Sequence, residues 1–273
     1  MNILDKIVAH KRTEVADAKL KVSISQLEET PLFVRPTLSL KKALQADGAT
    51  GIISEFKRKS PSKGIINDQV LPEIVTQGYV NAGACGLSVL TDTEFFGGTF
   101  EDFSRARSAN PITPMIRKDF MIDEYQLWEA KALGADVILL IAACLTPAEV
   151  QYLGQKAQEL GLEVLLEVHN QEELEQSLCE FVDMVGVNNR NLKTFVTDIE
   201  TSMELAQLIP NHFVKISESG LKDAKTIQQL RGVGYQGFLM GETFMQTQNP
   251  ALALEQLANE LKSQFSEFEN LKI

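Results

Sequence analysis

The segment Glu55-Phe56-Lys57 places an acid and a base two positions apart, directly after the apolar run Gly51–Ser54. Such a run is typical of a short buried strand, and because side chains alternate across a strand, Glu55 and Lys57 point to the same side. Charged groups are costly to bury, so the pair indicates either a strand-end ion pair or a site that handles charge and protons. The turn up to Gly64, rich in Ser, Pro and Gly, adds hydroxyls, backbone N–H groups and a lysine, which suit an anionic ligand.

Eight apolar stretches of strand length recur after residue 50, with amphipathic stretches between several of them. The predicted strands are Gly51–Phe56, Gly86–Leu90, Thr113–Arg117, Asp136–Ile141, Glu163–Val168, Asp183–Val187, Phe213–Ser217 and Gln236–Met240. The predicted helices include Leu71–Asn81, Asp123–Leu133, Pro147–Leu160 and Leu221–Leu230. Nearly continuous apolar strands alternating with helices indicate a parallel sheet covered by helices. Eight such units predict an α/β fold of the (β/α)8 (TIM) barrel type, with a doubly wound open sheet as the alternative.

The first 50 residues do not follow this alternation. Ile3–Leu20 has a broad apolar stripe and predicts a helix, and Ser39–Ala46 predicts a second one. Between them, Thr30–Thr37 is expected to be extended, because each proline disfavours helix in the residue before it. We predict a helical extension over residues 1–50, packed on a barrel domain over residues 51–273, within a single structural domain. The extension is expected to dock near the strand exits and to help cover the substrate.

Polar residues cluster at the predicted strand exits, where a parallel barrel carries its active site. They are Glu55, Lys57, Ser60, Lys118, Glu167, Asn188, Arg190, Glu218, Ser219, Gly220 and Gly241. Charged groups that converge on one mouth perturb each other's pKa values, as acid–base catalysis requires. The loops after the last two strands often bind phosphate in such barrels, and Ser219-Gly220 and Gly241-Glu242 fit that role. Lys215, inside the seventh strand, is either a structural residue or a Schiff-base lysine.

Composition excludes several classes of partner and site. The net charge of −11 argues against general nucleic-acid binding, so an anionic ligand must meet a local positive cluster. The three cysteines and three histidines show neither a disulfide framework nor metal-ligand spacing. There is no secretory signal, and no apolar run approaches the roughly 20 residues that span a bilayer. We expect a cytoplasmic monomer that binds neither metal, membrane nor nucleic acid.

The segment Glu55-Phe56-Lys57-Arg58-Lys59-Ser60-Pro61-Ser62 resembles the first-strand signature of the indole-3-glycerol phosphate synthase family. The resemblance continues in register through Arg117-Lys118-Asp119-Phe120, Asn188-Asn189-Arg190-Asn191 and Ser217-Glu218-Ser219-Gly220, and it covers essentially the whole chain. One mild departure is Glu242, where some members carry serine beside the phosphate. The resemblance implies that this carboxylate is turned away from the anion.

Members of this family convert 1-(2-carboxyphenylamino)-1-deoxyribulose 5-phosphate to indole-3-glycerol phosphate, CO2 and water without a cofactor. The resemblance implies that Lys118 is the general acid for ring closure, with a pKa lowered by burial and nearby cations against the pull of carboxylates. It implies that Lys57 holds the substrate carboxylate and that Glu167 is the acid–base residue in dehydration. Glu55 would assist proton transfer or orient the two lysines. The resemblance also implies that Asn188 and Arg190 bind hydroxyl and charged groups of the substrate, and that Ser60, Ser219, Gly220 and Gly241 surround the phosphate. Phe96 and Phe120 would lie either against the anthranilate ring or in the core of the loops. Glu218 would either orient a neighbouring residue or contact the ligand.

Two other functions remain open. One is a phosphosugar isomerase or aldolase on the same barrel, in which Lys215 would be the Schiff-base candidate. The other is a non-catalytic barrel that only binds a phosphorylated metabolite. The acid–lysine pair of the first strand and Lys118 argue against both.

Overall fold

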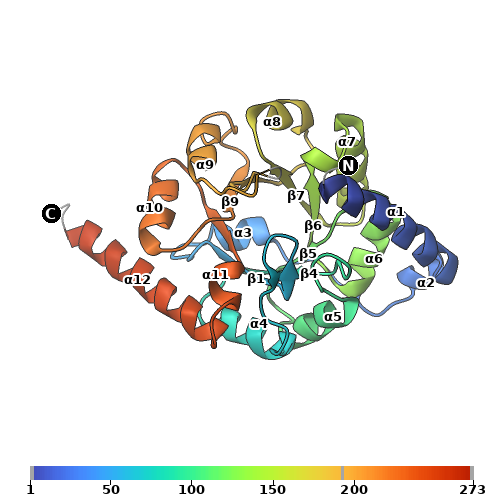
Figure 1. Cartoon of the computed structure of the whole chain (residues 1–273), viewed down its shortest axis with the longest axis horizontal. Helices are drawn as coiled ribbons and strands as arrows, with labels where there is room; N and C mark the ends of the chain where they lie inside the picture. Colours follow the sequence, from blue (N-terminus) through green and yellow to red (C-terminus); the bar gives the residue numbers. More distant parts are fainter. Residues whose placement is uncertain (1–2, 192–193, 271–273) are drawn as a thin grey trace.

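The computed structural model describes residues 3–191 and 194–270, and in this part of the chain eight parallel strands close into a barrel (Figure 1). The strands are β1 (Ile52–Phe56), β4 (Gly86–Leu90), β5 (Met115–Lys118), β6 (Val137–Ile141), β7 (Glu163–Val168), β8 (Met184–Asn188), β9 (Val214–Glu218) and β10 (Gly237–Met240). They pair in chain order, and β10 pairs with β1 to close the barrel. The predicted barrel is confirmed and the open sheet is wrong. All eight predicted strands are present, with ends that differ by at most two residues.

Helices surround the barrel and connect its strands (Figure 1). They are α4 (Pro72–Asn81), α5 (Phe100–Ala109), α6 (Tyr125–Leu133), α7 (Pro147–Glu159), α8 (Gln171–Ser177), α9 (Glu200–Leu205), α10 (Ala224–Gly232), α11 (Glu242–Met245) and α12 (Pro250–Asn270). Local sequence sets their ends. α7 begins where Thr146 and Glu149 form a capping box around Pro147, and α6 ends at Gly134, whose φ of 82° favours glycine. The first loop carries a small hairpin of β2 (Lys59–Ser60) and β3 (Gly64–Ile65), and a 3-10 turn, η1 (Ala142–Cys144), follows β6.

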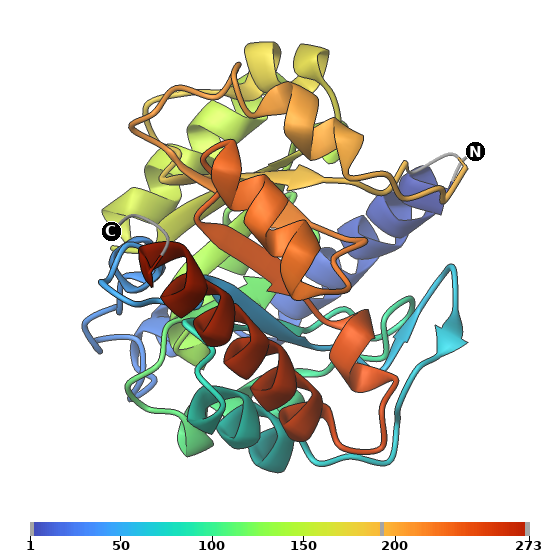
Figure 2. The ribbon, with the colours of Figure 1, turned by 90° about the vertical axis from the view of Figure 1, so that its left-hand side faces the viewer.

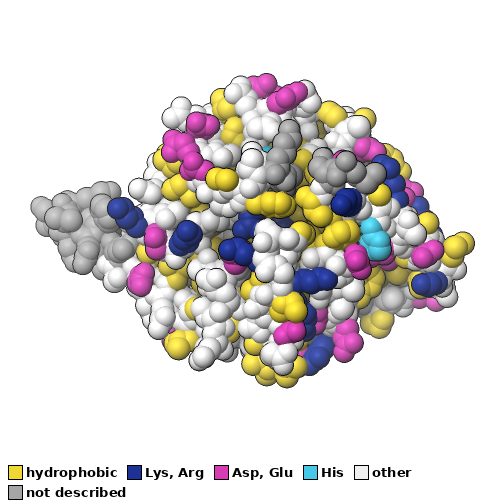
Figure 3. Space-filling model, viewed as in Figure 1, with side chains coloured by type: hydrophobic (Ala, Val, Ile, Leu, Met, Phe, Trp, Pro, Cys, Tyr) yellow, Lys and Arg dark blue, Asp and Glu magenta, His cyan; other side chains and the backbone are white. Residues whose placement is uncertain are grey.

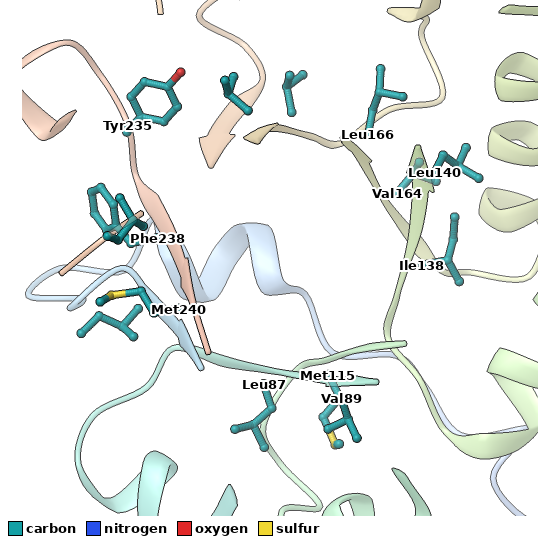
Figure 4. Packing of buried hydrophobic residues seen from close by; sticks show 14 of the residues in the cluster. Leu87, Val89, Met115, Ile138, Leu140, Val164, Leu166, Tyr235, Phe238 and Met240 are labelled. Atoms are coloured by element: carbon teal, nitrogen blue, oxygen red, sulfur yellow. The ribbon is translucent and has the colours of Figure 1, made fainter. Parts of the chain in front are cut away.

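Alternation along the strands separates two apolar layers. Ile138 and Leu140 of β6 belong to the larger cluster between strands and helices, and Figure 4 shows them pointing away from the barrel axis. Leu139, between them in sequence, belongs to the cluster that fills the barrel interior. Residues on every strand are therefore divided between the helix layer and the interior, and the polar residues at the strand ends lie above this interior layer.

The N-terminal extension contacts both ends of the barrel. It consists of α1 (Ile3–Lys21), α2 (Ile24–Glu28) and α3 (Leu40–Leu44). Leu40 and Leu44 join the interior cluster at the amino ends of the strands. Figure 2 shows α1 at the opposite end, on the same side as the β2–β3 hairpin. The expected position of the first helix near the strand exits is confirmed, while the division at residue 50 stays a prediction.

One expectation for the extension is wrong, and one of its helices was not predicted. Thr30–Thr37 is not an extended connector, because the N–H of Phe33 bonds to the carbonyl of Thr30 and the N–H of Arg35 bonds to that of Leu32. Proline disfavours helix before it but is well suited to the second position of a turn, which Pro31 occupies. Helix α2 was not predicted, although Ser23 and Gln26 form the capping box that starts it.

Candidate active site

A cavity of about 840 Å³ opens at the carboxyl ends of the strands. Every residue that the sequence predicts for the site lines it: Glu55, Lys57, Ser60, Phe96, Lys118, Phe120, Glu167, Asn188, Arg190, Glu218, Ser219, Gly220 and Gly241. Ile3, Leu4 and Ile7 of α1 complete its wall. Figure 3 shows Lys and Arg side chains gathered near the middle of this face, beside hydrophobic ones. The local positive cluster expected in this acidic protein is therefore present.

Lys118, at the end of β5, lies between two carboxylates from alternate strands. Its Nζ is 3.1 Å from Glu167 Oε2 on β7 and 2.7 Å from Glu218 Oε2 on β9. Burial alone would lower the pKa of Lys118. The negative charges of Glu218, Glu167 and Glu55 outweigh burial and raise this pKa above its usual value. The expectation that the pKa of Lys118 is lowered is therefore wrong, because the groups that contact its ammonium group are carboxylates and not cations.

The two carboxylates that share Lys118 differ in their pKa values. Burial would raise the pKa of Glu167, but Lys118 and His169 outweigh burial and hold it below its usual range. Burial raises the pKa of Glu218 to about 7, with Lys118 opposing and Glu167 adding to the rise. The two carboxylates therefore differ in the direction of their pKa shifts: Glu167 favours the ionised form, and Glu218 holds a proton more readily than an ordinary glutamate. Environments that separate two neighbouring pKa values in this way mark acid and base partners.

Glu167 is held by further donors. Its Oε1 accepts a hydrogen bond from Asn188 Nδ2 at 3.0 Å and lies 3.4 Å from His169 Nε2. The other ring nitrogen of His169 lies 3.0 Å from Glu173 Oε2. Burial would lower the pKa of His169, but these two carboxylates raise it to about 10. One oxygen of Glu167 is therefore bonded by Asn188 with the His169 ring beside it, and the other oxygen is bonded by Lys118.

Glu55 and Lys57 form the pair that alternation predicts. Lys57 Nζ lies 2.6 Å from Glu55 Oε1, and both side chains line the cavity. Gly241 lies against this pair, since a Cβ at that position would be 2.7 Å from Glu55 Oε1 and 2.8 Å from Glu55 Cβ. Glycine is thus required at position 241 to make room for Glu55, in addition to any approach of its backbone to an anion.

The loops after β9 and β10 form the other end of the cavity. Ser219 and Gly220 have φ values of 67° and 75°, so the backbone turns sharply directly after Glu218. Non-glycine residues adopt such angles at a cost, which is seen mainly at functional sites. Whether Glu242 turns away from a bound anion stays a prediction, but its position in the cavity is defined. Its carboxylate lines the cavity, 3.1 Å from Arg190 Nη2 and 3.5 Å from Lys63 Nζ. Two cations compensate for its charge there.

A family model described as indole-3-glycerol phosphate synthase matches residues 4–257. The chain belongs to this family. A curated indole-3-glycerol phosphate synthase of Bacteroides thetaiotaomicron is 50% identical over 262 residues, which cover 96% of this chain and 98% of the relative. One of Acidithiobacillus ferrooxidans is 41% identical over 94% of this chain and 98% of its own length.

Solved structures outside the indole-3-glycerol phosphate synthase family share only the fold. A 3-hexulose-6-phosphate synthase of Salmonella typhimurium superposes with a TM-score of 0.63 at 13% identity, covering 78% of this chain and 99% of its own. KGPDC from Streptococcus mutans gives a TM-score of 0.59 at 15% identity, over 78% and 97% of the two chains.

Sequence reasoning missed two charged residues near the site of this family member. His169 follows Glu167 at the same two-residue spacing as Glu55 and Lys57, so the alternation rule was sufficient to find it. Lys11 of α1 reaches buried carboxylates beside the cavity, and no local pattern indicates this. Lys215 does not line the cavity, and its Nζ donates to the carbonyl of Ala206. It is therefore a structural residue.

Within the described ranges, no group of three or more His, Cys, Asp or Glu side chains is arranged to hold a metal ion. None of the helices in those ranges is both long and apolar enough to cross a bilayer.

Proposed function

We propose that this chain is an indole-3-glycerol phosphate synthase, a carboxy-lyase of tryptophan biosynthesis. It would close the indole ring of 1-(2-carboxyphenylamino)-1-deoxyribulose 5-phosphate with loss of CO2 and water. Family membership over nearly the whole chain supports the reaction. The observation that carries the residue assignment is the contact of Lys118 with both Glu167 and Glu218 at the base of one cavity.

Lys118 is the proposed general acid for ring closure. Three carboxylates raise its pKa, so the ammonium form is fully populated when substrate arrives. As the aryl carbon attacks the ketone carbon, negative charge develops on the ketone oxygen, which accepts the proton. Lys57, paired to Glu55, lies within the same cavity and is proposed to hold the substrate carboxylate before decarboxylation.

Glu167 is the proposed base of the dehydration step, because its low pKa keeps it ionised. Glu218 is the proposed proton reservoir. Its pKa of about 7 and its 2.7 Å contact with Lys118 allow it to return a proton to the amine. Asn188 fixes Glu167 and is assigned the substrate hydroxyl as a second partner.

The phosphate is proposed to bind at the Ser219–Gly220 and Gly241 loops, with Ser60 and Arg190 as further donors. Backbone N–H groups in turns of this kind hold anions without a lysine. Phe96 and Phe120 are proposed to pack on the anthranilate ring. Their ring centroids are 5.9 Å apart, and both line the cavity.

The reaction is tested by adding 1-(2-carboxyphenylamino)-1-deoxyribulose 5-phosphate and following indole absorbance and fluorescence, with and without a chelator. The proposal expects indole formation that the chelator does not reduce, since no metal or cofactor is assigned a role. An aldolase or isomerase of the same fold would form no indole, and an aldolase would be trapped by borohydride. Absence of indole formation by folded protein refutes the proposal. We further propose a cytoplasmic monomer, which light scattering after size-exclusion chromatography tests for its oligomeric state.

A further inference from the structure

Lys11 is a fully buried lysine on a helix that lies outside the barrel. Its side chain is 1% exposed, and its Nζ lies 2.9 Å from Asp119 Oδ1 and 3.1 Å from Asp92 Oδ2. Both aspartate side chains are completely buried. Glu14, on the next turn of α1, supplies a third carboxylate at 2.9 Å. Burying this many charges is expensive unless each is paired, so the cluster requires an explanation beyond stability.

Each buried aspartate also holds the backbone beside an aromatic residue of the cavity. Asp92 Oδ1 accepts hydrogen bonds from the N–H groups of Phe95 at 2.8 Å and Phe96 at 3.2 Å. Asp119 Oδ1 accepts the N–H of Phe120 at 2.8 Å. Lys11 therefore joins the two carboxylates that set the backbone at Phe96 and Phe120, the pair of rings that lines the cavity.

The same lysine fixes the helix that supplies the apolar wall. Ile7 lies one turn before Lys11, on the same face of α1, and lines the cavity together with Ile3 and Leu4. Asp119 is also the residue after Lys118, so the network extends to the neighbour of the proposed acid. One side chain thus connects three parts of the site that come from α1 and from the loops after β4 and β5.

We propose that Lys11 is a positioning residue that assembles the aryl-binding half of the site. Through Asp92 and Asp119 it sets Phe96 and Phe120 against each other, and it seats the apolar end of α1 over the same space. The identity of the ligand as an aromatic ring with a carboxylate rests on the proposed function. The hydrogen bonds and ion pairs given for Lys11, Asp92 and Asp119 do not include the loops after β9 and β10, so we expect the phosphate end to be unaffected.

The link is permanent and not a pH switch. Burial alone would lower the pKa of Lys11, but Asp119 and Asp92 outweigh burial and raise it above its usual value. Arg117, which lies 3.1 Å from Asp119 Oδ2, and Thr91, which donates to the same oxygen at 2.6 Å, hold that aspartate ionised. The raised pKa keeps the lysine charged at neutral pH.

The experiment compares Lys11→Met with Lys19→Met. Lys19 is a matched control because it is on the same helix and also forms an ion pair, with Asp123 Oδ2 at 2.8 Å. It differs in being 44% exposed and in having no bond to Asp92 or Asp119. For each variant the readouts are kcat, KM, the Kd of anthranilate as the aryl half, and competitive inhibition by inorganic phosphate. Lys11→Met should raise KM and the anthranilate Kd by roughly tenfold to a hundredfold, the scale of an ångström-sized misplacement. Phosphate inhibition should be unchanged, and Lys19→Met should match wild type in every readout.

Two further variants keep the test decisive if Lys11→Met folds poorly. Lys11→Met combined with Asp92→Asn removes one charge of each sign, and asparagine retains the acceptor for the N–H groups of Phe95 and Phe96. Because the link to α1 is still lost, its anthranilate Kd should be raised. Lys11→Arg keeps the charge and should restore part of the anthranilate affinity. Circular dichroism and thermal unfolding establish that each variant is folded at the assay temperature.

Several results overturn the proposal. Lys11 is only a structural residue if the double variant binds anthranilate as wild type does, if phosphate and anthranilate weaken equally, or if Lys19→Met has the same effect. Failure of the proposed function gives a different outcome, in which wild-type protein itself forms no indole. If the wild-type protein turns over the substrate and the Lys11 variants have unchanged kinetics, the role of Lys11 is refuted while the proposed function stands.

Discussion

Glu218 should destabilise the folded protein at alkaline pH, and replacing it with glutamine should show this. Burial raises its pKa from 4.5 to about 7 in the folded state. A group with a raised folded pKa contributes its full stability below the unfolded value and loses it as pH rises through the folded value. The loss therefore begins near pH 4.5 and is complete above pH 7. Glutamine resembles the neutral acid and cannot ionise, so Glu218→Gln avoids the loss.

The size of the effect follows from the shift. A difference of 7 − 4.5 at 1.36 kcal/mol for each pKa unit gives an upper value of about 3 kcal/mol. The side chain is 3% exposed, so solvent screening reduces this little. Relative to wild type, Glu218→Gln should gain this stability between about pH 4.5 and pH 8, while its kcat falls because the proton reservoir is lost.

The assay is urea unfolding at about pH 5 and about pH 9, followed by fluorescence of the single tryptophan and by circular dichroism. The matched control is Glu167→Gln, which removes a carboxylate from the same lysine. The pKa of Glu167 is held below its usual range, so its charge stabilises the fold at neutral pH and the contribution is lost as pH falls below about 4.5. The control should therefore be less stable than wild type at high pH. If both variants change stability in the same direction at pH 9, the opposite pKa assignments are wrong.

Three further outcomes are expected. Lys118→Ala should lower kcat by about 10² to 10⁴ with the fold intact, and a loss under about tenfold in steady-state assays would remove Lys118 as the main acid. Glu167→Gln should lower kcat far more than the affinity for a non-reacting substrate analogue in calorimetry; a loss of binding with kcat preserved would assign it to binding instead. Glu242→Gln should tighten competitive inhibition by inorganic phosphate by severalfold, on the order of 1 kcal/mol, because it frees Arg190 and Lys63. Weaker inhibition would mean that Glu242 organises the phosphate site.

A Gly241→Val substitution would test whether a side chain at position 241 obstructs the phosphate, beside which the resemblance places Gly241. In the structure the first atom it meets belongs to Glu55. The variant would disturb the Glu55–Lys57 pair and the phosphate loop together, so it does not separate the two sites. Glu242→Gln leaves the backbone unchanged and is the cleaner probe.

The barrel and its strand exits were predictable because both depend on local pattern. Apolar runs predict all eight strands, and alternation along the first strand predicts that Glu55 lies beside Lys57. The convergence of Lys118, Glu167 and Glu218 followed from one rule about parallel barrels, since alternate strands direct side chains into the same layer.

Properties that depend on distances between remote residues were not predictable. Whether the pKa of Lys118 is raised or lowered depends on which charges surround its ammonium group. The structure places two carboxylates within hydrogen-bonding distance of it, and the sequence alone does not show this. No sequence pattern indicated that Lys11 is buried and paired, because a lysine on an amphipathic helix usually faces solvent and the aspartates that it contacts are far away in sequence. The partners of Glu242 were not predictable, because the two cations beside its carboxylate come from the first loop and from the loop after β8.

The extension is bonded to residues that follow it in the chain by about a hundred positions. Lys19 bonds a residue 104 positions further along the chain, Arg35 one that is 101 positions further, and Leu40 one that is 123 positions further. Contacts of such separation form slowly, because a long loop must close before they contribute stability. Helix α1 docks on the loops after β4 and β5, on α6 and on η1, so its docking surface requires the chain from β4 to β6. We therefore expect this helix to be seated only after the first half of the barrel has formed, so that the apolar wall of the cavity is added to strands that are already in place.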